Sequence, residues 1–219
     1  MPTMKGAFIN LGAGLLGALP NIIVFQFNPE RVTRNPALPR PPVQTDGSGT
    51  QDANQQPGQP GESISFSLRV DANEQLAQAN PIAVASGVLP TLSALELLMV
   101  PKSALTINLF RGAASGGQPF RNPPEKLDVV LFVWGPWRVL PVAVTSLSIT
   151  ETEYDTRLSP VRADVSVNLQ VLTTSNLAEN ALVARGAYRY SQAVKETMAA
   201  LNLANSAQIS GSMSLAFHI

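Results

Sequence analysis

A strict alternation of apolar and polar residues runs through residues 161–171, with apolar side chains at the odd positions and polar side chains at the even ones. A period of two residues is typical of a β-strand that buries one face and exposes the other. Residues 137–155 predict a second long strand, and the turn-forming residues between the two predict an antiparallel hairpin. Because Pro141 lacks a backbone N–H, it requires an edge position or a bulge in that strand.

Other stretches carry weaker strand patterns. Residues 63–70 alternate in the same way, residues 22–27 are rich in β-branched and aromatic side chains, and residues 5–10 fit a short strand. Residues 127–135 are almost continuously apolar, which predicts a central strand. With a faint pattern at 104–110, the expected number of strands is about seven.

Two stretches have helical spacing. Residues 86–101 place leucines and a methionine three or four positions apart and end at a proline, which predicts one short buried helix. The stretch at residues 73–87 predicts a polar connection with about one helical turn. Residues 177–203 predict a C-terminal helix, followed by a tail, residues 204–219, whose last six residues are able to add a strand to a neighbour.

The clearest change of composition is at residues 34–62. This tract holds six prolines, four glycines and no aromatic residue. It cannot bury enough apolar surface to offset its ordering entropy, so we expect a flexible arm when the chain is alone. In an assembly, a neighbouring subunit is the natural surface to hold it.

Composition narrows the classes of function. Apolar residues make up 45% of the 219 residues and charged residues only 14%, with 15 basic and 15 acidic side chains. A neutral, charge-poor surface gives no support for binding nucleic acid and predicts a protein that works in contact with other proteins. There is no cysteine, which excludes disulfides and thiolate chemistry. No apolar run approaches the ~20 residues of a membrane span, so we expect no direct membrane insertion.

Gly12, Gly14 and Gly17 have the spacing of a dinucleotide-binding loop. That loop must lie between a strand and a helix, so that a helix N-terminus faces the pyrophosphate. Here Pro20 and the apolar run at 22–27 follow at once, which leaves no room for a helix of about ten residues. We therefore expect a glycine-rich connection between two strands and no bound cofactor.

Candidate catalytic chemistry is sparse. His218 is the single histidine and stands next to the last residue, a poor platform for catalysis or metal binding. Glu151 and Glu153 share one strand face and are able to bind a metal or, as paired carboxylates more often do, an arginine. Trp134 and Trp137 are able to stack on a sugar or base, but more often such residues pack in a core or an interface. We expect no catalytic, cofactor-binding or metal-binding residues.

Three strings together resemble one family. Residues 14–34, "GLLGALPNIIVFQFNPERVTR", 87–101, "GVLPTLSALELLMVP", and 129–172, beginning "VVLFVWGPWRVLPVAV", are similar to the tube and baseplate-hub adaptor proteins of contractile, phage-tail-like injection systems. They occur in the family's order and span most of the chain. The resemblance singles out two motifs as interface candidates, namely Phe25, Phe27, Asn28, Pro29 and Glu30 in the first, and Trp134, Gly135, Pro136 and Trp137 in the second.

The resemblance implies a mainly β fold with flanking helices, an antiparallel β-sandwich or barrel of the phage tail tube type with one internal helix and a C-terminal helix. Residues 1–176 would form the tube-like domain. Copies would form a ring, expected to be a hexamer, in the baseplate hub that joins the central spike to the inner tube and initiates tube assembly. The implied partners are the inner tube protein, a VgrG-like spike protein and baseplate wedge proteins, and the implied role is mechanical.

Two further expectations accompany this resemblance. Many relatives carry a C-terminal LysM domain, whereas only sixteen residues follow position 203 here, so we expect no such module. The implied location is the cytoplasm, inside an assembled particle that is released or acts at the cell envelope. Two other hypotheses stay open: a ligand-binding β-barrel without catalysis, which would use the two tryptophans and a central cavity, and a cofactor enzyme that would use the glycines at 12–17.

Overall fold

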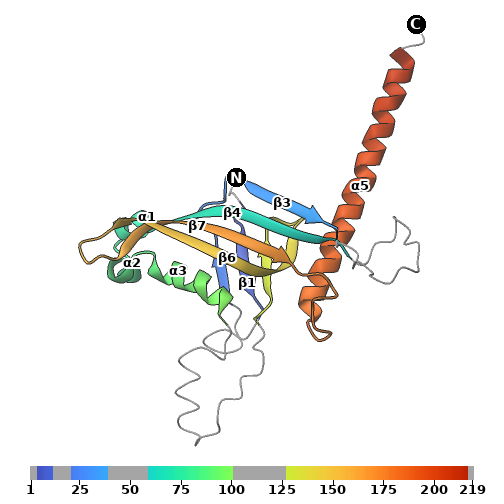
Figure 1. Cartoon of the computed structure of the whole chain (residues 1–219). Helices are drawn as coiled ribbons and strands as arrows, with labels where there is room; N and C mark the ends of the chain where they lie inside the picture. Colours follow the sequence, from blue (N-terminus) through green and yellow to red (C-terminus); the bar gives the residue numbers. More distant parts are fainter. Residues whose placement is uncertain (1–3, 12–20, 39–58, 101–126, 217–219) are drawn as a thin grey trace, which may run out of the picture.

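A single curled antiparallel sheet dominates the computed structural model, which describes residues 4–11, 21–38, 59–100 and 127–216 (Figure 1). Its strands lie in the order β2-β1-β5-β6-β7-β4-β3. The strands are β1 (Ala7–Asn10), β2 (Asn21–Val24), β3 (Val32–Ala37), β4 (Gly61–Asp71), β5 (Val130–Val133), β6 (Val139–Tyr154) and β7 (Pro160–Val171). The helices are α1 (Asn73–Ala77), α2 (Pro81–Ser86), α3 (Leu89–Glu96), the 3₁₀ turn η1 (Leu97–Met99) and α5 (Leu182–Ala216).

The sheet is open, because β2 and β3 are not paired with each other. This confirms the mainly β, antiparallel class but not a closed barrel. The curl nevertheless brings Phe25, just after β2, to 5.9 Å from Phe66 of β4 between ring centroids. Phe8 and Phe132 complete this group of four rings, which fills the middle of the curled sheet.

The long hairpin β6–β7 confirms the strongest sequence prediction. Its alternating residues face the core and solvent in turn, as the pattern requires. The Asp155 carboxylate closes the turn by accepting hydrogen bonds from the backbone N–H groups of Arg157 and Ser159, each at 2.8 Å. Register shifts between Val144 and Ser146 and again near Glu153 bend β6 away from a regular ladder.

Pro141 lies opposite Leu131 of β5, in a stretch without a register shift. The ladder with β7 begins one residue later, at Val142, so the missing N–H of Pro141 interrupts no pairing on that side. The prolyl carbonyl accepts a hydrogen bond from the Leu172 N–H at 2.8 Å. The proline is thus tolerated at the end of a ladder and not at a bulge.

The expectation of one internal helix was wrong. Three short helices and a 3₁₀ turn lie under one face of the long strands (Figure 1). The Asn80 side chain caps α2 by accepting from the Ile82 N–H at 3.0 Å. Gly87, with a positive φ of 57°, then separates α2 from α3. Leu92, Leu95 and Leu98 bury the predicted apolar stripe in the main core.

The Pro/Gly-rich tract is structured at both ends. β3 pairs with β4 from Val32 opposite Phe66 to Ala37 opposite Gly61. The two ends of the tract, which was expected to be a flexible arm, are thus paired strands. Pro36 fits there because β3 is an edge strand. Residues 39–58 lie outside the described residues.

The C-terminal helix differs from its expected limits of 177–203. α5 begins at Leu182 and continues to Ala216, through most of the expected tail. Residues 214–216, which had been considered for a strand, are helical. In Figure 1 the second half of α5 extends away from the sheet.

Candidate interaction surfaces

The two family-like motifs meet at Gly6. A Cβ atom at this glycine would lie 2.7 Å from the ring of Phe25 and 2.8 Å from the ring of Trp134, so only hydrogen fits between them. The Gly6 carbonyl also accepts a hydrogen bond from the Phe25 N–H at 2.8 Å. The chain start therefore joins segments that are more than a hundred residues apart. Sequence reasoning missed Gly6, because nothing local distinguishes it from other glycines.

Most of the first motif is structural. Phe25 is buried in the aromatic group, and Asn28 holds the chain start: its Oδ1 accepts from the Gly6 N–H at 2.9 Å, and its Nδ2 donates to the Met4 carbonyl at 2.8 Å. Phe27 is half exposed, and it lines a surface groove together with Pro29 and Glu30. Only these last three residues are placed to meet a partner.

The second motif forms a tight turn against α5. The Trp134 N–H donates to the Arg138 carbonyl at 2.8 Å, and Gly135 has the positive φ of 71° that the turn requires. Trp134 stacks on Phe132 at 6.1 Å, whereas Trp137 is 62% exposed. The Pro136 carbonyl accepts from the Tyr190 hydroxyl at 2.8 Å, which ties the turn to α5. The two tryptophans thus do not share a binding surface.

A groove of about 1080 Å³ lies between residues 27–33 and the outer face of β4 and β7. Its floor is made of small polar side chains, with paired charges at one end. The lining side chains include Ser65, Ser67, Ser166, Asn168, Arg69 and Asp164. Its chemistry is that of a neutral, hydrogen-bonding surface.

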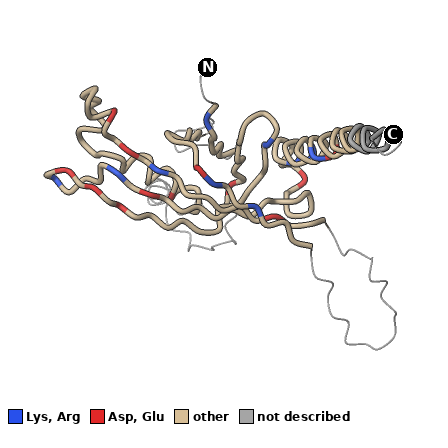
Figure 2. Tube along the Cα trace, turned by 90° about the horizontal axis from the view of Figure 1, so that it is seen from above, with Lys and Arg blue, Asp and Glu red and all other residues tan. Residues whose placement is uncertain are grey.

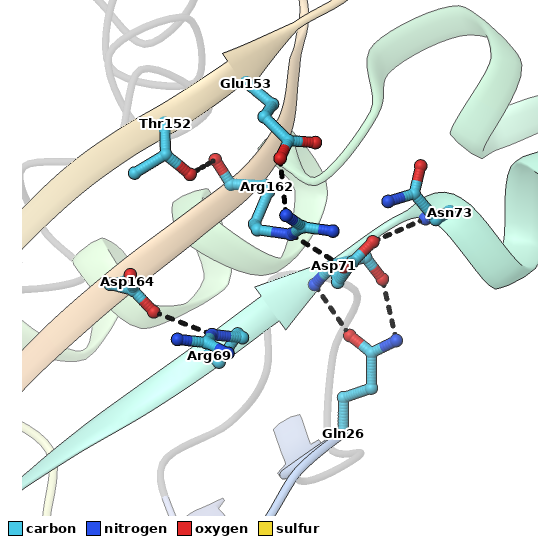
Figure 3. Close-up of polar contacts among 8 residues, drawn as sticks. All are labelled: Gln26, Arg69, Asp71, Asn73, Thr152, Glu153, Arg162 and Asp164. Atoms are coloured by element: carbon cyan, nitrogen blue, oxygen red, sulfur yellow. Dashed lines mark hydrogen bonds and ion pairs between the residues drawn. The ribbon is translucent and has the colours of Figure 1, made fainter.

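Figure 3 shows the paired charges where β4 ends and β7 begins. Arg162 donates through Nε to Asp71 Oδ2 at 2.8 Å and through Nη1 to the Glu153 carboxylate, and so joins three strands. Arg69 Nε lies 3.2 Å from Asp164 Oδ1. Both arginines of this network face a carboxylate, whereas Arg31, which also lines the groove, belongs to its opposite wall with Glu30.

Asp71 is the centre of this network. Burial raises the pKa of its carboxyl group, but hydrogen bonds from the Asn73 N–H and from Arg162 outweigh it, and the net pKa lies below the ordinary value. Hydrogen bonding to the Asp71 carboxylate likewise raises the pKa of Arg162. The shifts favour the charged forms of both groups, as expected for a structural ion pair.

Of Glu151 and Glu153, the second binds an arginine, as paired carboxylates more often do. The Glu151 carboxylate hydrogen bonds instead with Tyr154, which raises the pKa of that hydroxyl. Within the described ranges, no three metal-binding side chains lie close enough to hold an ion.

Glu62 is a second residue that sequence reasoning missed. Its side chain is 6% exposed and binds the guanidinium of Arg34 in β3 and the ammonium of Lys195 in α5, the latter at 3.1 Å. Burial raises the pKa of Glu62, but these two partners outweigh it and the net pKa is lowered. A sequence signal did exist, because Glu62 occupies the core-facing parity of the 61–71 alternation.

Several expectations fall on residues that the structure does not describe: the glycines at 12–17, the strand at 104–110 and His218. The flanks of the glycine stretch are informative, since Asn10 of β1 pairs with Asn21 of β2 in an antiparallel ladder. The stretch thus connects two neighbouring strands, as expected. Within the described part of the chain, no helix is long and apolar enough to cross a membrane.

Comparison with protein-family models and with curated proteins finds no match to this chain.

Proposed function

We propose that this chain is a structural subunit of a contractile injection system. Copies would close into a hexameric ring in the baseplate hub, between the central spike and the inner tube, and the ring would initiate tube assembly. The kind of particle and the partners in this proposal rest on the sequence resemblance. The arrangement of strands in the sheet gives a physical reason for ring formation.

The observation that carries the proposal is the unpaired margin of β6. β5 pairs only with residues 139–142, whereas β6 continues to Tyr154 with β7 on its other side alone. Within the described part of the chain, residues 143–154 of β6 are thus paired with a strand on one side only. An exposed strand margin of this length favours pairing with another chain.

A second margin lies on the opposite side of the same strands. β3 borders β4 and has no further strand beyond it in the described sheet. Two different margins on opposite sides suit a head-to-tail contact, and such a contact closes into a ring when the rotation between copies allows it. Closure would remove both margins from water.

The outer face between these margins is suited to protein contact. Serine, threonine and asparagine dominate the exposed positions of β4, β6 and β7, and the charged side chains of these strands, apart from Glu62, gather near the β6–β7 turn. The neutral groove offers a site for the ligand-binding alternative. However, the charged groups on its β4 and β7 side already bind one another, and the middle of the sheet is filled with phenylalanine rings. We therefore favour the ring.

Light scattering on the purified chain tests the proposal. The expected mass is six times the 23.2 kDa of one chain. Hydrogen exchange of the β6 amides at 143–154 should slow by about tenfold or more on assembly, because a neighbouring strand would occupy the margin. A chain that stays monomeric at all concentrations, also with tube and spike proteins present, would contradict the proposal.

A matched pair of variants locates the contact. Replacing Ser146 and Ser148 of β6 by lysine places two charges beside the margin, as natural edge strands do to prevent pairing. Their direct cross-strand partners in β7 are Asn168 and Ser166. The same double lysine change in β7 lies on the same face but one strand further in. Ring formation should be lost in the β6 variant and kept in the β7 variant.

A further inference from the structure

The helix α5 consists of a docked half and a projecting half. In the docked half, Ala184, Tyr188 and Ser191 are buried at helical spacing. The Ser191 hydroxyl donates to the Val139 carbonyl at 2.6 Å, and Lys195 reaches Glu62. From Glu196 to Ser206 every side chain is exposed. In both Figure 1 and Figure 2 this second half stands clear of the sheet.

The projecting half carries no charge. No Asp, Glu, Lys or Arg occurs between positions 197 and 216, which is 20 of the chain's residues in a row. Met198 is 41% exposed, Leu201 58% and Leu203 73%. A helix that stands alone in water is normally covered by charged side chains and their ion pairs. This half instead has the composition of a helix covered by another surface.

We propose that α5, from Val194 at the end of the docked half into the projecting half, packs in parallel against the same segment of other copies of this chain. Val194, Met198, Leu201 and Asn205 follow each other at spacings of four, three and four residues, the pattern of a coiled-coil seam. These four residues span fewer than two heptads, and at the same spacing the polar Gln208 and Ser212 follow them. The seam is defined here by those four residues, and Leu203 lies on the far side of the helix from it.

The absence of charged side chains favours a second copy of this helix as the binding partner. Parallel, in-register helices of one sequence bring identical residues to the same height, so a charged helix repels its own copy there. The uncharged half avoids that repulsion. A charged partner would lose hydration against this surface and find no opposite charge in return. A second copy carries a surface equally free of charge.

Asn205 adds a second argument for identical helices. A single asparagine among the apolar residues of a coiled-coil seam costs stability but fixes the register, because its amide is satisfied by the same amide of the other helix. The two amides reach the same height only when the helices are parallel and in register. Asn205 thus favours the same parallel, in-register arrangement as the absence of charged side chains does.

The anchoring of the docked half supports the parallel arrangement. Tyr190, Ser191 and Lys195 fix the helix base to the strands and the turn of its own domain. Copies related by a rotation axis would therefore present their helices in one direction. The seam is short and one of its four residues is polar, so the association is weak unless other contacts bring the copies together.

The chain has no cysteine, so a single introduced cysteine reports on one position only. The full chain with Leu201→Cys, oxidised under mild conditions, should give at least about fivefold more disulfide-linked dimer than the chain with Leu203→Cys, because only the seam brings two copies of one position within disulfide range. The two positions carry the same residue type and differ in helix face. Equal cross-linking at both, or none at either, would overturn the proposal.

Light scattering gives a second readout. Leu201→Glu should raise the concentration needed for self-association by about tenfold or more, whereas Leu203→Glu should leave it near the wild-type value. If a ring forms but Leu201→Cys does not cross-link, the helix contact is wrong and the ring stands. If Leu201→Cys cross-links but no ring forms with tube and spike proteins, the helix contact stands and the proposed function fails.

Discussion

The side-chain amide of Gln26 is hydrogen bonded to both backbone groups of Asp71: its Nε2 donates to the Asp71 carbonyl at 2.7 Å, and its Oε1 accepts from the Asp71 N–H at 2.9 Å. Gln26 follows β2, and Asp71 ends β4. The amide thus takes the place of a neighbouring peptide unit where the curled sheet stays open. A small pocket of about 120 Å³ lies along the same gap.

Gln26→Ala should lower the free energy of unfolding by about 1–3 kcal/mol, because it removes two hydrogen bonds and leaves part-buried backbone groups without a protein partner. Urea unfolding measures the change. Gln78→Ala is the control, since the side chain of Gln78 in the connection after α1 is exposed. An equal, small effect of both changes would mean that the hydrogen bonds between the Gln26 amide and Asp71 do not stabilise the fold.

Gly6→Ala should destabilise the chain by about 1–3 kcal/mol through overpacking, because a methyl group has no room between Phe25 and Trp134. Gly186→Ala in α5 provides the opposite case. No atom lies within 4 Å of its added Cβ, so the helix should gain about 1 kcal/mol. Chemical denaturation followed by tryptophan fluorescence measures both, and destabilisation of similar size in the two variants would refute the packing argument.

Gly87→Ala should be more damaging than Gly135→Ala, although both glycines have positive φ. A Cβ at Gly87 would lie 2.0 Å from the Pro160 carbonyl oxygen, whereas a Cβ at Gly135 meets nothing within 4 Å. We expect about 1 kcal/mol from backbone strain alone at Gly135 and at least about 3 kcal/mol at Gly87. Thermal melts of the soluble variants, or the loss of soluble protein for Gly87→Ala, check the order.

The stability of the chain should fall in acid partly because of Glu62. The pKa of its carboxyl group is lower in the folded chain than in the unfolded chain, so the charged form favours folding. That stabilisation is present above the ordinary pKa of a glutamate and is lost as the pH falls through the lower, folded pKa. Glu62→Gln should therefore flatten the acid side of the stability curve and cost about 2 kcal/mol near neutral pH.

Unfolding free energies between pH 3 and 7 test this expectation. The control is Glu74→Gln in α1, whose side chain is exposed. If the two variants follow the same pH dependence, the contacts with Arg34 and Lys195 do not stabilise the charged form of Glu62.

The sequence predicted the hairpin of β6 and β7 because apolar and polar residues alternate there, and this alternation shows which side chains are buried. It predicted only about one helical turn where α1 and α2 form, because these helices are five and six residues long and depend on single residues such as Asn80 and Gly87. It also placed β3 in a flexible tract, because the pairing with β4 that orders it is a tertiary contact.

The sequence predicted which two segments form the candidate surfaces, but it did not predict the role of each residue in them. Phe25 and Asn28 were expected at an interface, yet they hold the chain start in place. The motifs identify segments that matter, but burial decides which side chains are free. The burial of Phe25 and Trp134 depends on Gly6, which packs between these two side chains from distant parts of the chain.

The uncharged half of α5 has a consequence for handling the protein. Contacts between charged surfaces weaken as sodium chloride screens them, but this helix offers nothing to screen. Its association should instead follow the lyotropic order of anions: sulfate, which is excluded from apolar surface, should tighten it, and urea should loosen it.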